Sequence, residues 1–107
     1  MDTPAVTVVV PTRGRAAYLE VTLGSLLRQR TGTPHEIIVV DDGSADATRD
    51  VAARAGVRCV SHGASRGLNA ARNTGIREGR GLLLAFVDDD VEAPPGWLEA
   101  LARGAER

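Results

Sequence analysis

The sequence predicts an α/β fold of three layers, in which helices cover both faces of a mainly parallel sheet. Two observations support this prediction. Apolar runs typical of buried strands alternate along the chain with segments whose apolar residues recur at helical spacing. Each apolar run is also followed by a polar segment, as expected where parallel strands end at one edge of a sheet. Residues 1–107 are expected to form one domain.

Strands and helices are predicted in strict alternation, without a linker or an internal repeat. In order they are a strand over 6–10, a helix over 16–29, a strand over 36–40, a helix over 46–55, a strand over 57–60, a helix over 68–78, a strand over 82–87 and a helix over 96–103. The first strand is a β-branched run that should stop at Pro11, because proline removes a backbone donor. Leucines at helical spacing define the first helix. The second strand is nearly all apolar, and Gly56 suits the end of the second helix.

The second half of the chain carries the segment around which the rest is organised. A short third strand leads through a polar, glycine-rich loop into the third helix. Residues 82–87 are six apolar residues in a row, typical of a strand buried on both faces in a parallel sheet. Three aspartates follow at once, at 88–90. Two prolines then precede the last helix, which should carry Trp97, Leu98 and Leu101 on one side.

Composition limits the classes of function. Apolar and charged contents of 43% and 25% are ordinary for a globular protein, and a net charge of -1 gives no broad basic face for nucleic acid. The chain has no lysine, which excludes a Walker-type phosphate loop and a Schiff-base enzyme. Cys59 is alone, so no internal disulfide can form. We expect no membrane span and, because Met1 to Ala5 is polar, no secretory leader.

Four polar clusters, at 11–15, 41–44, 61–69 and 88–90, follow the four predicted strands and should therefore meet at one edge of the sheet. The aspartates at 88–90 repel one another, and an oxygen-rich cluster without Cys or paired His suits Mg²⁺ or Mn²⁺ rather than zinc. Such an ion usually completes its shell with water and substrate phosphates. The alternative interpretation is a solvated acidic turn.

The other clusters also admit two interpretations. Asp41 and Asp42 can accept hydrogen bonds from a uracil-like base or a ribose, or they can form a helix cap and turn with Gly43; we expect one aspartate to be structural and the other to contact ligand. Arg66 and Arg72 either neutralise a diphosphate or face solvent. His62 has no nearby partner for a metal site and is expected on the surface.

The clusters together resemble the ordered motifs of family 2 glycosyltransferases with the GT-A fold. The segments that carry the resemblance are Val-Val-Val-Pro-Thr-Arg-Gly-Arg (8–15), Ile-Ile-Val-Val-Asp-Asp-Gly-Ser-Ala-Asp (37–46), Gly-Leu-Asn-Ala-Ala-Arg-Asn-Thr-Gly (67–75) and Leu-Ala-Phe-Val-Asp-Asp-Asp-Val (84–91). That family transfers a sugar from a nucleotide-sugar donor to an acceptor. The resemblance therefore implies a UDP- or GDP-linked donor and a divalent cation, Mn²⁺ or Mg²⁺.

The resemblance also implies roles for single residues. Pro11, Thr12 and Arg15 would line the nucleotide-sugar site, and Asp42 would bind the base with Asp41 beside it. Residues 88–90 would be the Asp-X-Asp motif, in which Asp89 faces the ribose and Asp88 and Asp90 lie at the metal. Arg72 would lie near the donor phosphates. The resemblance favours inversion of the anomeric configuration.

One departure from the family concerns length. Such catalytic domains usually continue for about as long again, and that later half carries the acceptor pocket and the general base. We therefore name no catalytic base, and expect the donor-binding half of an enzyme with exposed apolar surface and a tendency to self-associate. One alternative is a non-catalytic nucleotide-binding module or a truncated remnant. Another is a nucleotidyltransferase or phosphotransfer domain, and the missing lysine counts against this one. The expected location is cytoplasmic, or at the inner membrane face in a longer protein.

Overall fold

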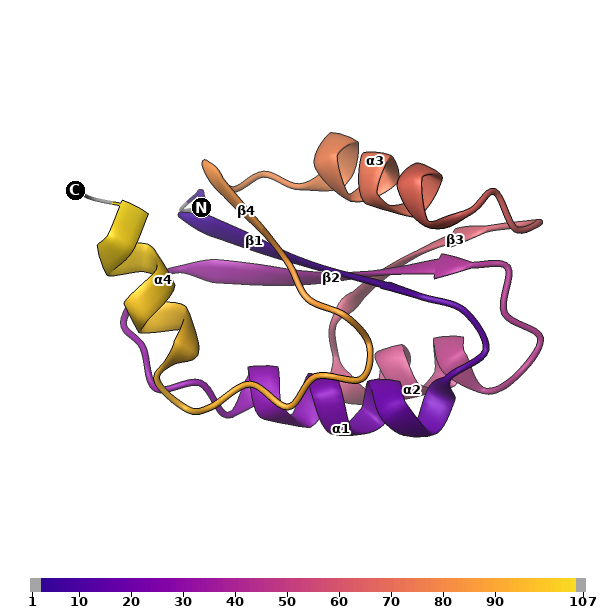
Figure 1. Ribbon diagram of the computed structural model, residues 1–107, viewed down its shortest axis with the longest axis horizontal. Helices are drawn as coiled ribbons and strands as arrows, with labels where there is room; N and C mark the ends of the chain where they lie inside the picture. Colours follow the sequence, from indigo (N-terminus) through magenta and orange to yellow (C-terminus); the bar gives the residue numbers. More distant parts are fainter. Residues whose placement is uncertain (1–2, 106–107) are drawn as a thin grey trace.

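The computed structural model describes residues 3–105, in which strands and helices alternate along the chain (Figure 1). The elements are β1 (Val6–Thr12), α1 (Ala16–Leu27), β2 (His35–Asp42), α2 (Thr48–Ala55), β3 (Arg58–His62), α3 (Leu68–Glu78), β4 (Leu83–Phe86) and α4 (Trp97–Ala105). Within this part of the chain the strands form one sheet, in the order β3-β2-β1-β4, and every pairing is parallel. The predicted α/β architecture is confirmed. The extreme ends of the expected domain, including the start of the polar segment from Met1, lie outside the described residues.

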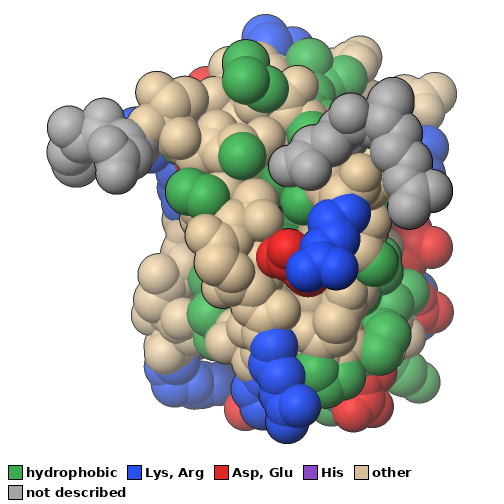
Figure 2. Space-filling model, turned by 90° about the vertical axis from the view of Figure 1, so that its left-hand side faces the viewer, with side chains coloured by type: hydrophobic (Ala, Val, Ile, Leu, Met, Phe, Trp, Pro, Cys, Tyr) green, Lys and Arg blue, Asp and Glu red, His purple; other side chains and the backbone are tan. Residues whose placement is uncertain are grey.

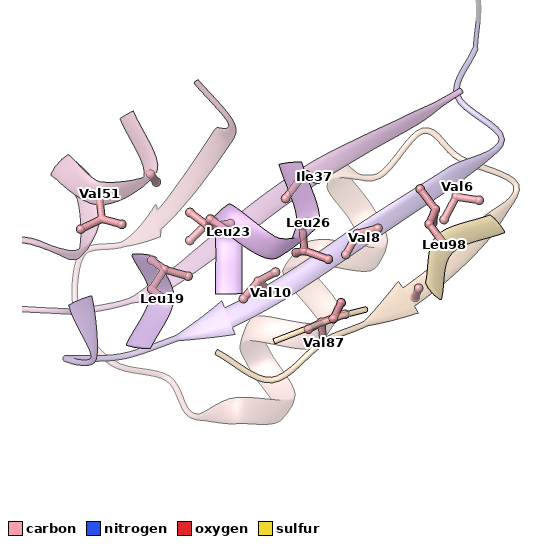
Figure 3. Close-up of a cluster of buried hydrophobic side chains, with 14 residues drawn as sticks. Val6, Val8, Val10, Leu19, Leu23, Leu26, Ile37, Val51, Val87 and Leu98 are labelled. Carbon is pink, nitrogen blue, oxygen red and sulfur yellow. The ribbon is translucent and has the colours of Figure 1, made fainter. Parts of the chain in front are cut away.

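Helices cover both faces of the sheet, with α1 and α2 on one side and α3 on the other (Figure 1). The pleat of β1 divides its valines between two cores. Val6, Val8 and Val10 pack with the buried leucines of α1, as Figure 3 shows, while Val9 packs with Ala71 of α3. On the α3 side the helix lies so close to the sheet that a Cβ on Gly75 would collide with Val9. These contacts fix the third helix, and with it the loop that precedes it, against the sheet.

The last helix behaves as its apolar spacing predicts. Leu98 is buried beside Val6, and Trp97 and Leu101 are partly buried against the same core (Figure 3). Figure 2 shows the end of the molecule at which the strands begin, where basic, acidic and hydrophobic side chains are interspersed. No helix within residues 3–105 is long and apolar enough to cross a membrane.

The expectation that Pro11 ends the first strand is wrong, because β1 continues through Pro11 to Thr12. Val9 directs its backbone toward β4, since its carbonyl accepts the N–H of Val87. Pro11 lies two residues on and therefore faces the same side. The pairing with β4 has already ended at Phe86, so no ladder partner on that side needs the missing proline donor.

The expectation that the apolar run over 82–87 is buried on both faces is also wrong. Within the described sheet β4 is the edge strand next to β1, and it pairs over only Leu83–Phe86. Leu82 is 95% exposed and Phe86 is 43% exposed. A continuous apolar run indicates a strand, but it does not show whether other parts of the protein cover both faces of that strand.

Candidate functional site

A pocket of about 380 Å³ opens at the edge where the strands end. Its lining comes from the ends of β1, β2 and β4 and the start of α3: Pro11, Thr12, Arg13, Arg15, Asp42, Leu68, Ala71, Asp88, Asp89 and Asp90. The volume is within the range of small-molecule sites. Segments separated by up to 79 positions in the sequence, from Pro11 to Asp90, thus meet at one place, as the parallel topology predicts.

Asp89 anchors the acidic turn after β4 to the rest of the fold. The hydroxyl of Thr12 donates to its Oδ2 at 2.8 Å, and the hydroxyl of Thr22 donates to its backbone carbonyl at 2.9 Å. Arg15 lies 3.5 Å from Asp89 Oδ1 and 3.6 Å from Asp90 Oδ2. Asp89 is buried by these contacts, whereas the neighbouring Asp88 and Asp90 are exposed to the pocket.

The carboxylates of Asp88 and Asp90 are the exposed acidic groups in the pocket lining. Within residues 3–105, no group of three or more His, Cys, Asp or Glu side chains is placed to hold a metal ion. Mg²⁺ and similar hard cations are commonly held by one or two carboxylates, with water and substrate phosphates as the remaining ligands. Two carboxylates on the rim of an open pocket fit that mode of binding.

Asp42 differs from these two because donors from the described residues surround its carboxylate. Its Oδ1 accepts the N–H of Arg66 at 2.8 Å and lies 2.7 Å from Nδ1 of His62. Its Oδ2 accepts the hydroxyl of Ser65 at 2.8 Å and the N–H of Gly67 at 2.9 Å. Burial alone would raise the pKa of Asp42, but these hydrogen bonds to the ionised form outweigh burial and hold the pKa far below its ordinary value.

Asp41 has a structural environment and does not line the pocket. Its Oδ1 accepts the N–H of Ser44 at 2.9 Å, which closes the turn after β2, and Ser61 and Arg49 lie near its Oδ2. Gly43 in that turn has φ +77°, and the backbone of Ser65 lies 2.7 Å from where its Cβ would be. Only glycine fits there, so the loop over 63–67 lies directly on the turn.

The expectation that His62 lies on the surface is wrong, because the residue is buried, with only 6% of it exposed. Its Nδ1 contacts Asp42 and its Nε2 lies 2.8 Å from the hydroxyl of Thr74 on α3. One signal in the sequence points to the first contact. Asp42 and His62 end neighbouring parallel strands, and the register pairs them directly.

Arg66, in the loop before α3, and Arg72, on α3, have different surroundings. Arg66 contributes its backbone N–H to Asp42. Arg72 lies outside the pocket described above and lines an adjoining one together with Asp88, Phe86 and Trp97. The site also includes Arg13, Leu68 and Ala71, which the sequence did not single out. Their positions next to a strand end and at a helix start are the only signals of that role.

Known proteins resemble this chain in sequence. The family model described as glycosyl transferase family 2 matches residues 7–107. The putative glycosyltransferase EpsH of Bacillus subtilis (strain 168) is 41% identical over 98% of this chain and 31% of its own length. Validoxylamine A glucosyltransferase of Streptomyces hygroscopicus subsp. jinggangensis is 40% identical over 92% of this chain and 25% of its own length. The chain thus spans about a third or less of the curated relatives it matches.

Solved structures give the same result. The mannosyltransferase PcManGT from Pyrobaculum calidifontis, in complex with GDP-Man and Mn²⁺, matches 99% of this chain and 32% of its own, with a TM-score of 0.82 and 28% identity. S. aureus TarS 1–349, in complex with UDP, matches 94% of this chain and 32% of its own, with a TM-score of 0.86 and 26% identity. Both likenesses extend over nearly the whole of the chain.

Proposed function

The chain belongs to glycosyl transferase family 2, and from that premise we propose that it forms the donor-binding part of an enzyme that transfers a sugar from a nucleoside diphosphate sugar to an acceptor hydroxyl. The observation that supports this proposal best is the pocket where the ends of β1, β2 and β4 meet. Asp42, on one side of the pocket, supplies a hydrogen-bond acceptor for a nucleobase. The aspartates at 88–90, on the other side, supply carboxylates for the metal ion that accompanies a diphosphate.

We further propose that Asp88 and Asp90 hold Mn²⁺ or Mg²⁺. A bound divalent cation supplies Lewis-acid stabilisation of the negative charge on the departing diphosphate. The complexes of PcManGT with GDP-Man and Mn²⁺, and of glucosyl-3-phosphoglycerate synthase from Mycobacterium tuberculosis with Mn²⁺ and UDP, support a divalent ion.

The remaining assignments are part of the same proposal. Arg15, which already faces Asp89 and Asp90, is placed to neutralise the diphosphate. Thr12 and Pro11 line the pocket beside the ribose, and Asp89 contacts the ribose. Asp42 takes the base. Arg72, at the far side of Asp88, reaches the phosphates only from the adjoining pocket. The acceptor hydroxyl oxygen attacks the anomeric carbon from the face opposite the diphosphate as the bond from that carbon to the diphosphate oxygen breaks. A general base of the whole enzyme takes the hydroxyl proton, and the transfer inverts the configuration.

Calorimetric titration with UDP and GDP, with and without Mn²⁺, tests the proposal. We expect binding that needs Mn²⁺ and that Asp90→Ala weakens by more than about tenfold, because a charged metal ligand is lost. Asp50→Ala is the matched control, since Asp50 is an exposed aspartate of α2 outside the pocket. Binding that is independent of the metal and survives Asp90→Ala would overturn the metal assignment.

The alternative is a nucleotide-binding module without catalysis. Incubation with UDP-glucose or GDP-mannose and Mn²⁺ separates the two. Hydrolysis or transfer above the rate of an Asp90→Ala control supports an enzyme, and NMR of the product's anomeric proton reports the configuration. Nucleotide binding without any turnover would favour the binding module.

A further inference from the structure

A chain of hydrogen bonds runs from the exposed Arg77 of α3 through the buried Thr74 and His62 to the pocket. Nη2 of Arg77 lies 3.2 Å from the hydroxyl oxygen of Thr74, Thr74 is 2.8 Å from Nε2 of His62, and Nδ1 of His62 is 2.7 Å from Asp42. An arginine can only donate, and an ionised carboxylate can only accept. The chain is therefore satisfied throughout if Thr74 donates to Nε2 and the Nδ1–H of His62 donates to Asp42. This assignment fixes the tautomer and the orientation of the imidazole ring.

The donors around Asp42 leave it no free acceptor position for a ligand. The two oxygens of a carboxylate offer about four acceptor positions, and His62, Ser65 and the N–H groups of Arg66 and Gly67 fill them. Asp42 nevertheless lines the pocket. A nucleobase can therefore reach this carboxylate only by displacing one of these donors.

Ser65 is the donor that can leave at least cost. His62 is buried and held by Thr74, and the two backbone N–H groups belong to a loop that lies on Gly43. Ser65 instead reaches Asp42 through an exposed side chain with a single torsion to rotate. Its departure frees one acceptor position, on Oδ2, while the donors to Oδ1 stay in place.

We propose that His62, held by Thr74, is a positioning residue that orients Asp42 toward the nucleobase, and that the hydroxyl of Ser65 occupies the place of the base N–H until a nucleotide binds. The inference rests on the proposed function and deepens it by naming the class of base. One freed position suits the single imide N–H of uracil or thymine. Guanine presents two adjacent N–H groups to a carboxylate and would need a second donor to leave.

Calorimetric titration with UDP in the presence of Mn²⁺ tests the inference, with inorganic pyrophosphate as the ligand that lacks a base. We expect His62→Leu to weaken UDP binding by about tenfold, because a hydrogen bond to a charged group is lost and the carboxylate is released. Pyrophosphate binding should stay within about twofold, since it engages the other end of the pocket. His62→Gln, which can both donate and accept, should recover most of the UDP affinity.

Ser65 gives an effect in the opposite direction. Because its hydroxyl must leave, Ser65→Ala should bind UDP as tightly as the unaltered protein or more tightly, although it too removes a hydrogen bond from Asp42. The matched control for the histidine is His35→Leu, since His35 lies at the start of β2, away from the pocket. That variant should leave the affinities for both ligands unchanged.

Several outcomes would overturn the inference. UDP binding unchanged by His62→Leu and by Thr74→Val would contradict the positioning role, as would equal losses for UDP and pyrophosphate. Should His62→Leu not unfold cooperatively, Thr74→Val, which keeps the ring and removes its anchor, decides the question. A loss of UDP affinity on Ser65→Ala would contradict the exchange, and tighter binding of GDP than UDP would contradict the class of base. Failure of the unaltered protein to bind any nucleotide would instead refute the proposed function itself.

Discussion

Two pairs of aspartates lie at the edge of the sheet where the strands end, and their surroundings differ; Asp42, Asp88 and Asp90 line the pocket, and Asp41 does not. Asp41 and Asp42, at the end of β2, are buried and accept hydrogen bonds from the neighbouring turn and loop. Asp88 and Asp90, after β4, are exposed, and Arg15 lies near Asp90. A carboxylate whose acceptor positions are filled holds the fold in shape, whereas an open one is available for a cation. Under the proposed function, this difference suits Asp41 to holding the turn, Asp42 to base recognition, and Asp88 and Asp90 to metal binding.

The largest expected effect is on stability and concerns the buried pair. Asp42→Ala should lower the free energy of unfolding by about 3 kcal/mol, because the donors of the 63–67 loop and His62 lose their shared acceptor. Asp90→Ala should change it by less than about 0.5 kcal/mol, since that side chain is exposed. Urea unfolding followed by circular dichroism measures both. Equal losses for the two variants would remove the distinction between the pairs.

The pH dependence of stability also tests the role of the buried pair. The hydrogen bonds that outweigh burial hold the pKa of Asp42 below its ordinary value, so folding favours the ionised form. Its contribution to stability is full above the ordinary pKa of about 4 and is lost as the pH falls further toward the folded-state pKa. The free energy of unfolding should therefore fall below about pH 4 more steeply for the unaltered protein than for Asp42→Asn. If the free energies of unfolding of the two proteins fell in parallel with pH, folding would not favour the ionised form of Asp42.

Arg15 should give effects of opposite sign on two ligands. Its guanidinium lies near Asp89 and Asp90 and therefore competes with a cation there. Arg15→Gln should tighten the binding of Mn²⁺ alone by roughly twofold to fivefold, the range expected for an exposed ion pair. The same variant should weaken Mn²⁺-pyrophosphate, because a positive charge facing the phosphates is lost. Arg28→Gln, at the opposite end of α1 and outside the pocket, is the control. A change of the same sign for both ligands would contradict this role.

The smallest expected effect concerns the exposed edge of β4. Phe86 and Leu82 leave apolar surface beside a strand that pairs only with β1 among the described strands. We propose that this edge lets two copies associate weakly at high concentration. Light scattering should show a mass that rises with concentration, and Phe86→Lys should suppress the rise. A single monomer mass for the unaltered protein at all concentrations would contradict the proposal.

The sequence predicts most of the fold and the place of the site. The alternation of strands and helices and the meeting of polar clusters at one edge follow from local patterns, and α3 begins and ends where the pattern predicts. The burial of His62 does not follow from local patterns, because it depends on Thr74 and on the register of β3 against β2. The exposure of β4 likewise depends on its place in the sheet, which an apolar run does not encode. The length of β1 depends on where its partner strand stops.

The most direct test of the division between the two aspartate pairs is to measure free Mn²⁺ by electron paramagnetic resonance with inorganic pyrophosphate present. Pyrophosphate carries no base, so the measurement reports the metal end of the pocket alone. We predict that Asp90→Asn weakens Mn²⁺ binding by about tenfold or more, while Asp42→Asn, folded at the same temperature, changes it by less than about twofold. Equal weakening by both variants, or no weakening by Asp90→Asn, would contradict the assignment of the cation to the exposed aspartates.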